Sequence, residues 1–316
     1  MKLQTIIPLK QSERHINYDS ELLLVGSCFV EHIGAKLSDF KFKSLTNPFG
    51  ILFHPEAIAR LFERAVLQKQ FTVADATLVD DYYVSLDAHS NLNATTDNAV
   101  ILNLNKALED FQNKLKKASH IIVTLGTAWG YRCILQNKIV ANCHKIPQKN
   151  FTKELASVVE VEDALKRILK SVSAINPEAS VIFTVSPVRH LKDGFVENQR
   201  SKAHLLTAIH SIVDSNETVE YFPSYEIMMD ELRDYRFYNR DLIHPNELAI
   251  DFIWERFRMA YFTENTHILF NKIGEIQRGL AHRAFNPESK KHQKFLDKLS
   301  DKITRLQQEL PHIKFK

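Results

Sequence analysis

The chain has 316 residues, of which 44% are hydrophobic and 25% are charged, and this ordinary globular composition excludes a mainly disordered protein. Three cysteines are too few for a disulfide scaffold, so we expect free thiols. The formal net charge of +3 is too small to indicate a nucleic-acid partner. No stretch approaches the roughly 20 apolar residues of a membrane span, and the first residues do not resemble a signal peptide. We therefore expect a cytoplasmic protein with no membrane span.

Short apolar runs rich in β-branched residues predict buried strands at 22–26, 120–126, 181–186 and 219–222, with a weaker strand at 42–45. Helical periodicity lies between and after them, at 29–39, 55–68, 98–118, 151–176, 195–213 and 245–262. Alternating strands and helices predict an α/β fold. Because the strands are hydrophobic throughout, we expect a three-layer, doubly wound parallel sheet of flavodoxin-like type, covered by helices on both faces.

Three stretches fall outside this alternation. Residues 72–96 resemble short strands, and 131–143 resemble a β-hairpin that turns at Gln136–Asn137. We expect both to be insertions over the carboxyl ends of the sheet. In the basic C-terminal stretch, apolar residues at helical spacing predict an amphipathic helix: Phe295, Leu299, Ile303, Leu306 and Leu310. We expect two domains, 1–263 and a helical extension, 264–316. Its helix either packs on the domain or contacts an anion, a membrane surface or a second copy in a homodimer.

In an open α/β sheet, ligands bind beyond the carboxyl ends of the strands, so the residues found there are the first candidates for chemistry. Cys28 follows the first strand and opens a helix, where the helix dipole stabilises a thiolate. Asp241 precedes His244 by three residues, which lets the carboxylate bind one ring nitrogen and leaves the other as a general base. The alternatives are a small buried Cys28, a turn residue Asp241 and a surface histidine His244.

The segment Val25-Gly26-Ser27-Cys28-Phe29 resembles the Gly-Asp-Ser-Leu motif of the SGNH/GDSL hydrolase superfamily. More closely, it resembles the Gly-Ser-Cys-Phe signature of the GSCFA family, with Val30 where the family name has Ala. Further stretches similar to that family are 47–50, 126–129, 142–145, 186–188 and 193–198, and the resemblance covers residues 20–260 and, weakly, the tail. It implies an SGNH-like fold and a bacterial acyl esterase, thioesterase or acyltransferase without a cofactor. The implied substrate is a small-molecule or carbohydrate ester, such as an O-acetylated sugar.

The resemblance also assigns roles to individual residues. Cys28 matches the nucleophile, His244 the base and Asp241 the residue that orients it. Gly50 matches a backbone donor of the oxyanion hole, with the N–H of Cys28 as a second donor. The superfamily has a third donor, an Asn, where this chain has Ala128. Ser27 is the rival nucleophile. Besides Gly50, the candidate residues for the oxyanion hole and the substrate are Ser27, Asn47, Thr127, Trp129, Asn142 and His144.

Other interpretations remain open from the sequence. Arg189 and Lys202 either hold a substrate carboxylate or phosphate, or form ordinary surface ion pairs. A metal site would combine Cys28 and His244 with Cys143 and His144, but no close pair of ligands supports it, so we expect no metal. The main alternative function is a non-catalytic, ligand-binding protein that has kept the fold.

Overall fold

A computed structural model describes residues 4–315. The first three residues of the expected domain 1–263 and the last residue of the expected extension 264–316 lie outside the described part. The five strands of the central sheet are β1 (Glu21–Gly26), β2 (Lys43–Thr46), β5 (His120–Leu125), β9 (Ser180–Val185) and β10 (Val219–Phe222). They are all parallel, in the order β10-β9-β5-β1-β2. The predicted parallel sheet of flavodoxin-like strand order is confirmed. The order reverses between β1 and β5, the place where such sheets bind ligands.

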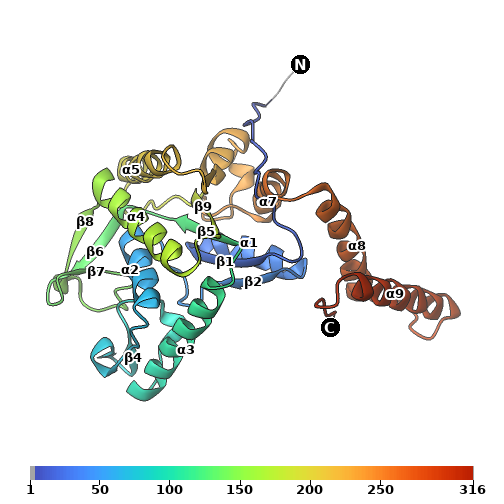
Figure 1. Ribbon diagram of the computed structural model, residues 1–316, viewed down its shortest axis with the longest axis horizontal. Helices are drawn as coiled ribbons and strands as arrows, with labels where there is room; N and C mark the ends of the chain where they lie inside the picture. The colour runs from blue at the N-terminus through green and yellow to red at the C-terminus, as the bar shows by residue number, and fades with distance from the viewer. Residues whose placement is uncertain (1–3, 316) are drawn as a thin grey trace.

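Both faces of the sheet are buried, and successive residues of a strand face opposite layers. Leu23 and Val25 pack with α2 (Pro55–Val66), α3 (Asp97–Leu115), α4 (Val158–Ile175) and α5 (Phe195–Val213). Leu22 and Leu24 pack with α1 (Cys28–Asp39) and α7 (Glu247–Tyr261). Figure 1 shows these helices around the strands. The three-layer arrangement that the continuous hydrophobic runs predict is therefore confirmed.

The helix predicted over 151–176 is wrong in its first seven residues, since α4 begins at Val158. Phe151–Leu155 form β8, which pairs antiparallel with β6 (Trp129–Cys133). The helix α4 begins after Ser157, whose hydroxyl accepts the N–H of Glu160 while the Glu160 carboxylate accepts the N–H of Ser157. This capping box fixes the start of the helix, so the residues before it are free to pair with β6.

The two insertions form small sheets of their own. The predicted hairpin consists of β6 and β7 (Lys138–Val140), and β8 joins it as a third strand. The other insertion pairs β3 (Thr77–Val79) with β4 (Tyr82–Val84). Short helical turns complete the chain; they are α6 and the turns η1 to η5, at 224–226, 73–75, 90–92, 148–150, 227–231 and 235–237.

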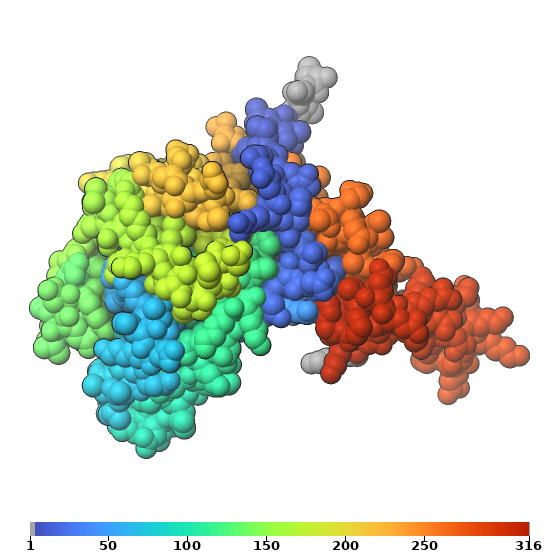
Figure 2. All heavy atoms as spheres, viewed as in Figure 1, coloured from blue at the N-terminus to red at the C-terminus, as the bar shows by residue number. Residues whose placement is uncertain are grey.

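After the α/β domain the chain forms α8 (Glu264–Ala281) and α9 (Lys290–Glu309). The two helices run antiparallel: Lys272 of α8 pairs with Glu309 of α9 at 2.8 Å, and Glu275 pairs with Lys302. Leu299 and Leu306 of α9 are buried in the apolar cluster that the two helices share with the domain. Figures 1 and 2 show the pair extending away from the body as an arm. None of the helices formed by residues 4–315 is long and apolar enough to cross a membrane.

Candidate active site

The loops that follow β1, β2 and β5 are joined by backbone hydrogen bonds at the carboxyl edge of the sheet. The N–H of Ser27 donates to the carbonyl of Thr124 (3.1 Å), and the N–H of Leu52 donates to the carbonyl of Gly26 (2.9 Å). Gly26 has φ +141°, and a Cβ atom there would lie 2.2 Å from the Thr124 carbonyl oxygen. Only glycine tolerates this conformation and this close approach. The chain is thereby turned so that α1 begins at Cys28, at the point where the strand order reverses.

The structure distinguishes the two rival nucleophiles by their exposure. Ser27 is 2% exposed, and its hydroxyl has no hydrogen-bond partner among the described residues. Cys28, the first residue of α1, is partly exposed and is a free thiol. Adjacent side chains point in different directions, so the solvent side of the edge carries Cys28 rather than Ser27.

The surroundings of Cys28 hold its thiol in the protonated form. Burial, followed by the Glu31 carboxylate, raises the pKa of the thiol above its ordinary value. The backbone N–H groups of Phe29 and Cys28 and the Lys202 ammonium lower it by less. The ionised thiolate expected from the helix N-terminus is therefore not present at neutral pH. A reaction at Cys28 needs a base to remove the proton.

Asp241 and His244 form the contact that a general base requires. An oxygen of the Asp241 carboxylate lies 2.6 Å from His244 Nδ1, while the other oxygen accepts the N–H groups of Ile243 (2.9 Å) and His244 (3.0 Å). These contacts, the His244 N–H most of all, lower the pKa of Asp241 to about 2, so the carboxylate is ionised at neutral pH. In the neutral tautomer that donates Nδ1–H to the carboxylate, Nε2 is free to accept a proton. Asp241 is thus both the turn residue and the partner of the ring.

The loop that carries this pair is held by Arg189. The Arg189 guanidinium donates to the Leu242 carbonyl and lies 4.7 Å from the centre of the Tyr238 ring. Leu242 itself has φ +58°, an uncommon conformation for this residue type that the surrounding contacts must maintain. The N–H of Asn239 donates to the His244 carbonyl (2.8 Å), which closes the loop. Of the two interpretations of Arg189, a ligand of a substrate anion or a surface ion pair, the structure shows neither: its guanidinium binds the loop that carries His244.

Cys28 and His244 share one edge of the sheet without touching. Helices α1 and α7, which follow the two residues, pack against each other. His32, one turn beyond Cys28 on α1, has its pKa lowered by burial and, to a smaller degree, by the charge of His244. Within residues 4–315 no hydrogen bond joins the Cys28 sulfur to the imidazole. Catalytic hydrogen bonds are often long in ligand-free enzymes and tighten when substrate binds.

The expected oxyanion donor Gly50 is already engaged. Its N–H donates to the Asn47 carbonyl at 2.8 Å, so the prediction that this N–H is free for an oxyanion is wrong. Gly50 has φ +73°, and a Cβ atom there would lie 2.4 Å from atoms of His89 and Asn91. The glycine is therefore required by the turn and by the segment packed over it. The Asn47 side chain accepts the N–H of Gly26 (2.9 Å) and so holds the end of β1.

Thr127 and Trp129 contact their own neighbours rather than an open site. The Thr127 hydroxyl pairs with that of Ser201 (2.9 Å) and accepts the N–H of Trp129 (3.0 Å). The indole N–H of Trp129 donates to the Glu197 carbonyl (3.2 Å). Ala128 is buried, and its N–H donates to the Ser201 hydroxyl (2.7 Å). These residues fasten the loop after β5 to α5.

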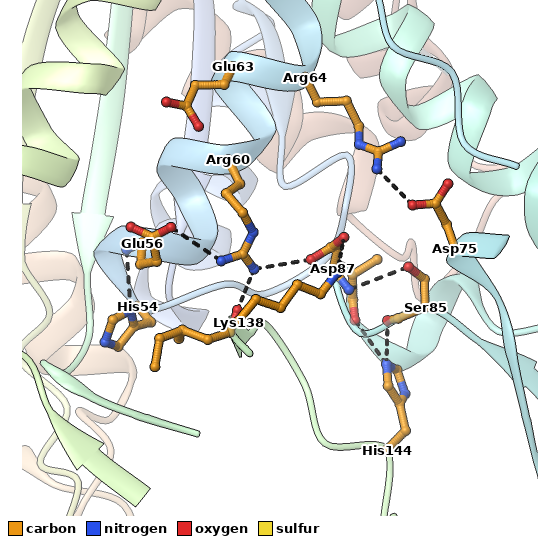
Figure 3. A network of polar contacts seen from close by, with 12 residues as sticks. His54, Glu56, Arg60, Glu63, Arg64, Asp75, Ser85, Asp87, Lys138 and His144 are labelled. Carbon is orange, nitrogen blue, oxygen red and sulfur yellow. Dashed lines mark hydrogen bonds and ion pairs between the residues drawn. The ribbon is translucent and has the colours of Figure 1, made fainter. Parts of the chain in front are cut away.

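Asn142 and His144 lie where the two insertions meet. His144 Nε2 lies 2.7 Å from the Ser85 carbonyl and 3.1 Å from that of Ala88, as Figure 3 shows for the labelled Ser85 and His144. The Asn142 side chain accepts the N–H of His144 (2.9 Å). The Asn142 side-chain oxygen and His144 Nε2 are occupied within this network, whereas His144 Nδ1 is buried without a hydrogen-bond partner among the described residues. No set of three or more His, Cys, Asp or Glu side chains suited to a metal ion occurs in residues 4–315.

Sequence reasoning missed the burial of Lys202. Its side chain is 1% exposed, and its ammonium donates to the carbonyls of Gly126 (2.8 Å) and Ser186 (2.7 Å), which follow β5 and β9. Burial lowers the pKa of Lys202 to about 7. The spacing offers one signal, because Lys202 stands three and seven residues before the buried Leu205 and Ile209, on the apolar face of α5.

A cavity of about 530 Å³ opens elsewhere, between α2, α4 and the sheet β7-β6-β8. Its charged groups already pair with neighbours: Arg132 with Glu154 at 2.9 Å, and Lys138 with Asp87 at 2.8 Å. Figure 3 shows Arg60 of α2 between Glu56 and Asp87 in the same network. Since these polar groups satisfy one another, we place the candidate active site at the sheet edge despite the size of this cavity.

Two family models match successive parts of the chain. The model of the GSCFA family matches residues 21–257, and that of the GSCFA domain protein, C-terminal domain, matches residues 273–316. A solved structure from Streptococcus pneumonia, provisionally described as a platelet activating factor, is 12% identical over 75% of this chain and 83% of its own, with a TM-score of 0.37. No curated protein matches the chain.

Proposed function

This chain belongs to the GSCFA family, and we propose that it is a hydrolase or acyltransferase of the SGNH type that acts on ester or thioester bonds. The observation that carries the proposal is the hydrogen bond between Asp241 and His244, at the sheet edge that also carries the accessible thiol of Cys28. An ionised carboxylate, an imidazole with a free nitrogen and a nucleophile are the three parts that acyl transfer requires.

In the proposed reaction, His244 Nε2 takes the thiol proton as the Cys28 sulfur attacks the carbonyl carbon of the ester. The carbonyl oxygen becomes an oxyanion, and the N–H of Cys28 stabilises it, since the first turn of a helix has no carbonyl partner for that group. The intermediate then expels the alcohol, which takes the proton from His244, and leaves a thioester on Cys28. Water, or an acceptor alcohol, loses a proton to His244 and attacks the thioester. The acid or new ester leaves, and the thiol regains its proton. Asp241 stabilises the imidazolium in both steps.

A non-catalytic binding protein is the second candidate, and three observations favour it. Ala128 replaces an oxyanion donor, the N–H of Gly50 is engaged, and burial raises the pKa of the Cys28 thiol. Such a protein would bind an ester or a related ligand at the same edge but would form no covalent intermediate.

The experiment that separates the candidates is detection of an acyl-enzyme. The full chain is incubated with p-nitrophenyl acetate, acetyl-CoA or an O-acetylated saccharide, and its peptides are examined by mass spectrometry. We expect one acetyl group on the Cys28 peptide, lost in Cys28→Ala and formed about 10²–10⁴-fold more slowly in His244→Ala. Cys143→Ala, which removes another partly exposed thiol, is the matched control.

Three outcomes would contradict the proposal. Full turnover in Cys28→Ala together with loss of turnover in Ser27→Ala would transfer the role of nucleophile to Ser27. Equal rates in wild type and His244→Ala would remove the general base. Saturable ligand binding with no acetylated peptide would favour the binding protein.

A further inference from the structure

The ammonium of Lys202 is a buried charge without an ionised partner. Its side chain is 1% exposed, and its two hydrogen bonds go to the neutral carbonyls of Gly126 and Ser186. Within residues 4–315 no carboxylate lies within ion-pair distance of it. Two carbonyls only partly replace the water that a buried ammonium loses, so such a charge is costly unless an anion compensates it. A negative charge placed near Lys202 would therefore stabilise its ammonium form.

The position of Lys202 relative to Cys28 follows from the sheet. Gly126 follows β5, which lies beside β1, and the N–H of Ser27 donates to the β5 residue Thr124 at 3.1 Å. Neighbouring strands are about 4.8 Å apart. Because the ammonium bridges the ends of β5 and β9, it lies within about two strand spacings, roughly 10 Å, of the start of α1. At this distance, with little water between the groups, a full charge changes the ionisation of a thiol.

Among the described residues, none of the other groups near Lys202 forms an ion pair with it. His190, in the loop after β9, has its pKa lowered to about 3 by burial and then by Lys202, so it is neutral. Tyr225 of α6 offers the face of its ring, 5.3 Å from the ammonium. The Glu226 carboxylate is engaged by the Tyr221 hydroxyl at 2.7 Å. Cys28 of α1 and Glu226 are the two ionisable groups whose negative charge acts on Lys202, and the effect of Cys28 is the larger.

We propose that Lys202 is the counter-ion for the negative charge that develops at Cys28 during acyl transfer. This inference rests on the proposed function. When the thiol loses its proton, the ammonium stabilises the thiolate, and it continues to do so as the charge moves to the oxyanion of the tetrahedral intermediate. Because it acts at a distance through Cys28 and is itself fixed by two strand ends, Lys202 is a positioning residue that biases the ionisation of the nucleophile.

The direct test is the rate of Cys28 alkylation by iodoacetamide between pH 6 and 9, read by mass spectrometry. Alkylation follows the thiolate fraction. In Lys202→Met we expect alkylation to be about tenfold slower at pH 6, where Lys202 is charged in the wild type, and the difference to shrink toward pH 9 as the wild-type Lys202 loses its proton. Ser201→Ala is the matched control: Ser201 is equally buried and ties the same loop to α5, but it carries no charge. Cys143 is the internal reference in every sample.

An unmoved profile in Lys202→Met, or an equal shift in Ser201→Ala, would overturn the inference. The proposed function would survive that result if wild-type Cys28 still forms an acetyl thioester. Conversely, a Cys28 that responds to Lys202 but never becomes acetylated would refute the proposed function while leaving the electrostatic coupling in place.

A second measurement keeps the inference testable if Lys202→Met does not fold. It uses His244→Ala, in which Lys202 is intact and the imidazole no longer contributes. If the Lys202 charge is lost near pH 7, the thiol becomes harder to ionise over the same range. We expect Cys28 alkylation to rise by clearly less than tenfold per pH unit between pH 6 and 8, while Cys143 follows the tenfold rise of an isolated thiol. A tenfold rise for Cys28 as well would overturn the coupling.

Discussion

Replacement of Arg189 by Met should release the loop that carries Asp241 and His244. A hydrogen bond from a charged donor contributes about 1.5–3 kcal/mol, and an exposed cation–π contact about 0.5–1 kcal/mol. Arg189 makes one such bond to the Leu242 carbonyl and lies over the Tyr238 ring at 4.7 Å. Since Met keeps part of the apolar contact, we expect a net loss of about 2–3 kcal/mol in the docking of the loop. This corresponds to a roughly 30- to 150-fold larger open population.

Hydrogen exchange reports on this population, because a loop released by Arg189 opens its internal hydrogen bonds more often. The N–H groups of Ile243 and His244 donate to Asp241, and that of Asn239 donates to the His244 carbonyl. In Arg189→Met these amides should exchange about 30- to 150-fold faster, with the β5 amides unchanged. Arg236→Met is the control, because the Arg236 side chain is 72% exposed and pairs with Asp234 at 3.6 Å. Unchanged exchange of the loop in Arg189→Met would refute the role assigned to Arg189.

Three further changes test other parts of the structure. Asp241→Asn keeps an acceptor for the loop N–H groups but turns an amide N–H₂ toward Nδ1 of His244, so the ring proton moves to Nε2. Ester hydrolysis should then fall about 10²–10⁴-fold. A rate within twofold of wild type would contradict this expectation. Because contacts in the folded state depress the pKa of Asp241 to about 2, the pair should stay intact as pH falls and break only near that pH, and a carboxyl titration by NMR with a midpoint above pH 4 would be inconsistent with it. Ser27→Ala removes a buried, unpartnered hydroxyl, so urea unfolding should change by less than about 1 kcal/mol, and a tenfold loss of hydrolysis would indicate that Ser27 reacts. Leu299→Ala should cost about 2–4 kcal/mol and speed amide exchange in α9 but not in β5, and equal effects in both would show that the arm and the domain unfold together.

The sheet could be predicted from the sequence because its strands are buried on both faces. In β5 all six residues are buried, so the hydrophobic run is unbroken and its ends are clear. The strand β8 has no such buried run. Its residues Phe151–Leu155 are half-buried or exposed, and they lead into a helix of similar composition. Their pairing with β6 depends on residues about twenty positions earlier, which periodicity within the segment does not reveal.

The same distinction applies to the candidate site. Asp241 and His244 are three residues apart, so their hydrogen bond follows from local chemistry and could be predicted; their catalytic role remains a prediction. For other candidate residues, the contacts that determine their position and burial are made with residues far away in the sequence. His144 binds carbonyls 59 and 56 residues earlier, and Lys202 binds a carbonyl 76 residues earlier. The hydrogen bond from the N–H of Gly50 to Asn47 belongs to a local turn. The segment that packs over Gly50, however, contains His89 and Asn91, which lie about forty residues later in the chain.

The two halves of the candidate site should therefore form at different times as the chain folds. The Asp241–His244 turn closes over four residues, and contacts of this kind form in microseconds or less. Cys28 reaches its place only when Gly26 pairs with Thr124 in a parallel sheet, and such distant pairings form slowly. During refolding the hydrogen bond between Asp241 and His244 should form early, whereas Cys28 reaches its final position only after the central strands have paired. The time at which a newly made chain completes its candidate active site is then set by pairing of the central strands, rather than by formation of the loop that carries Asp241 and His244.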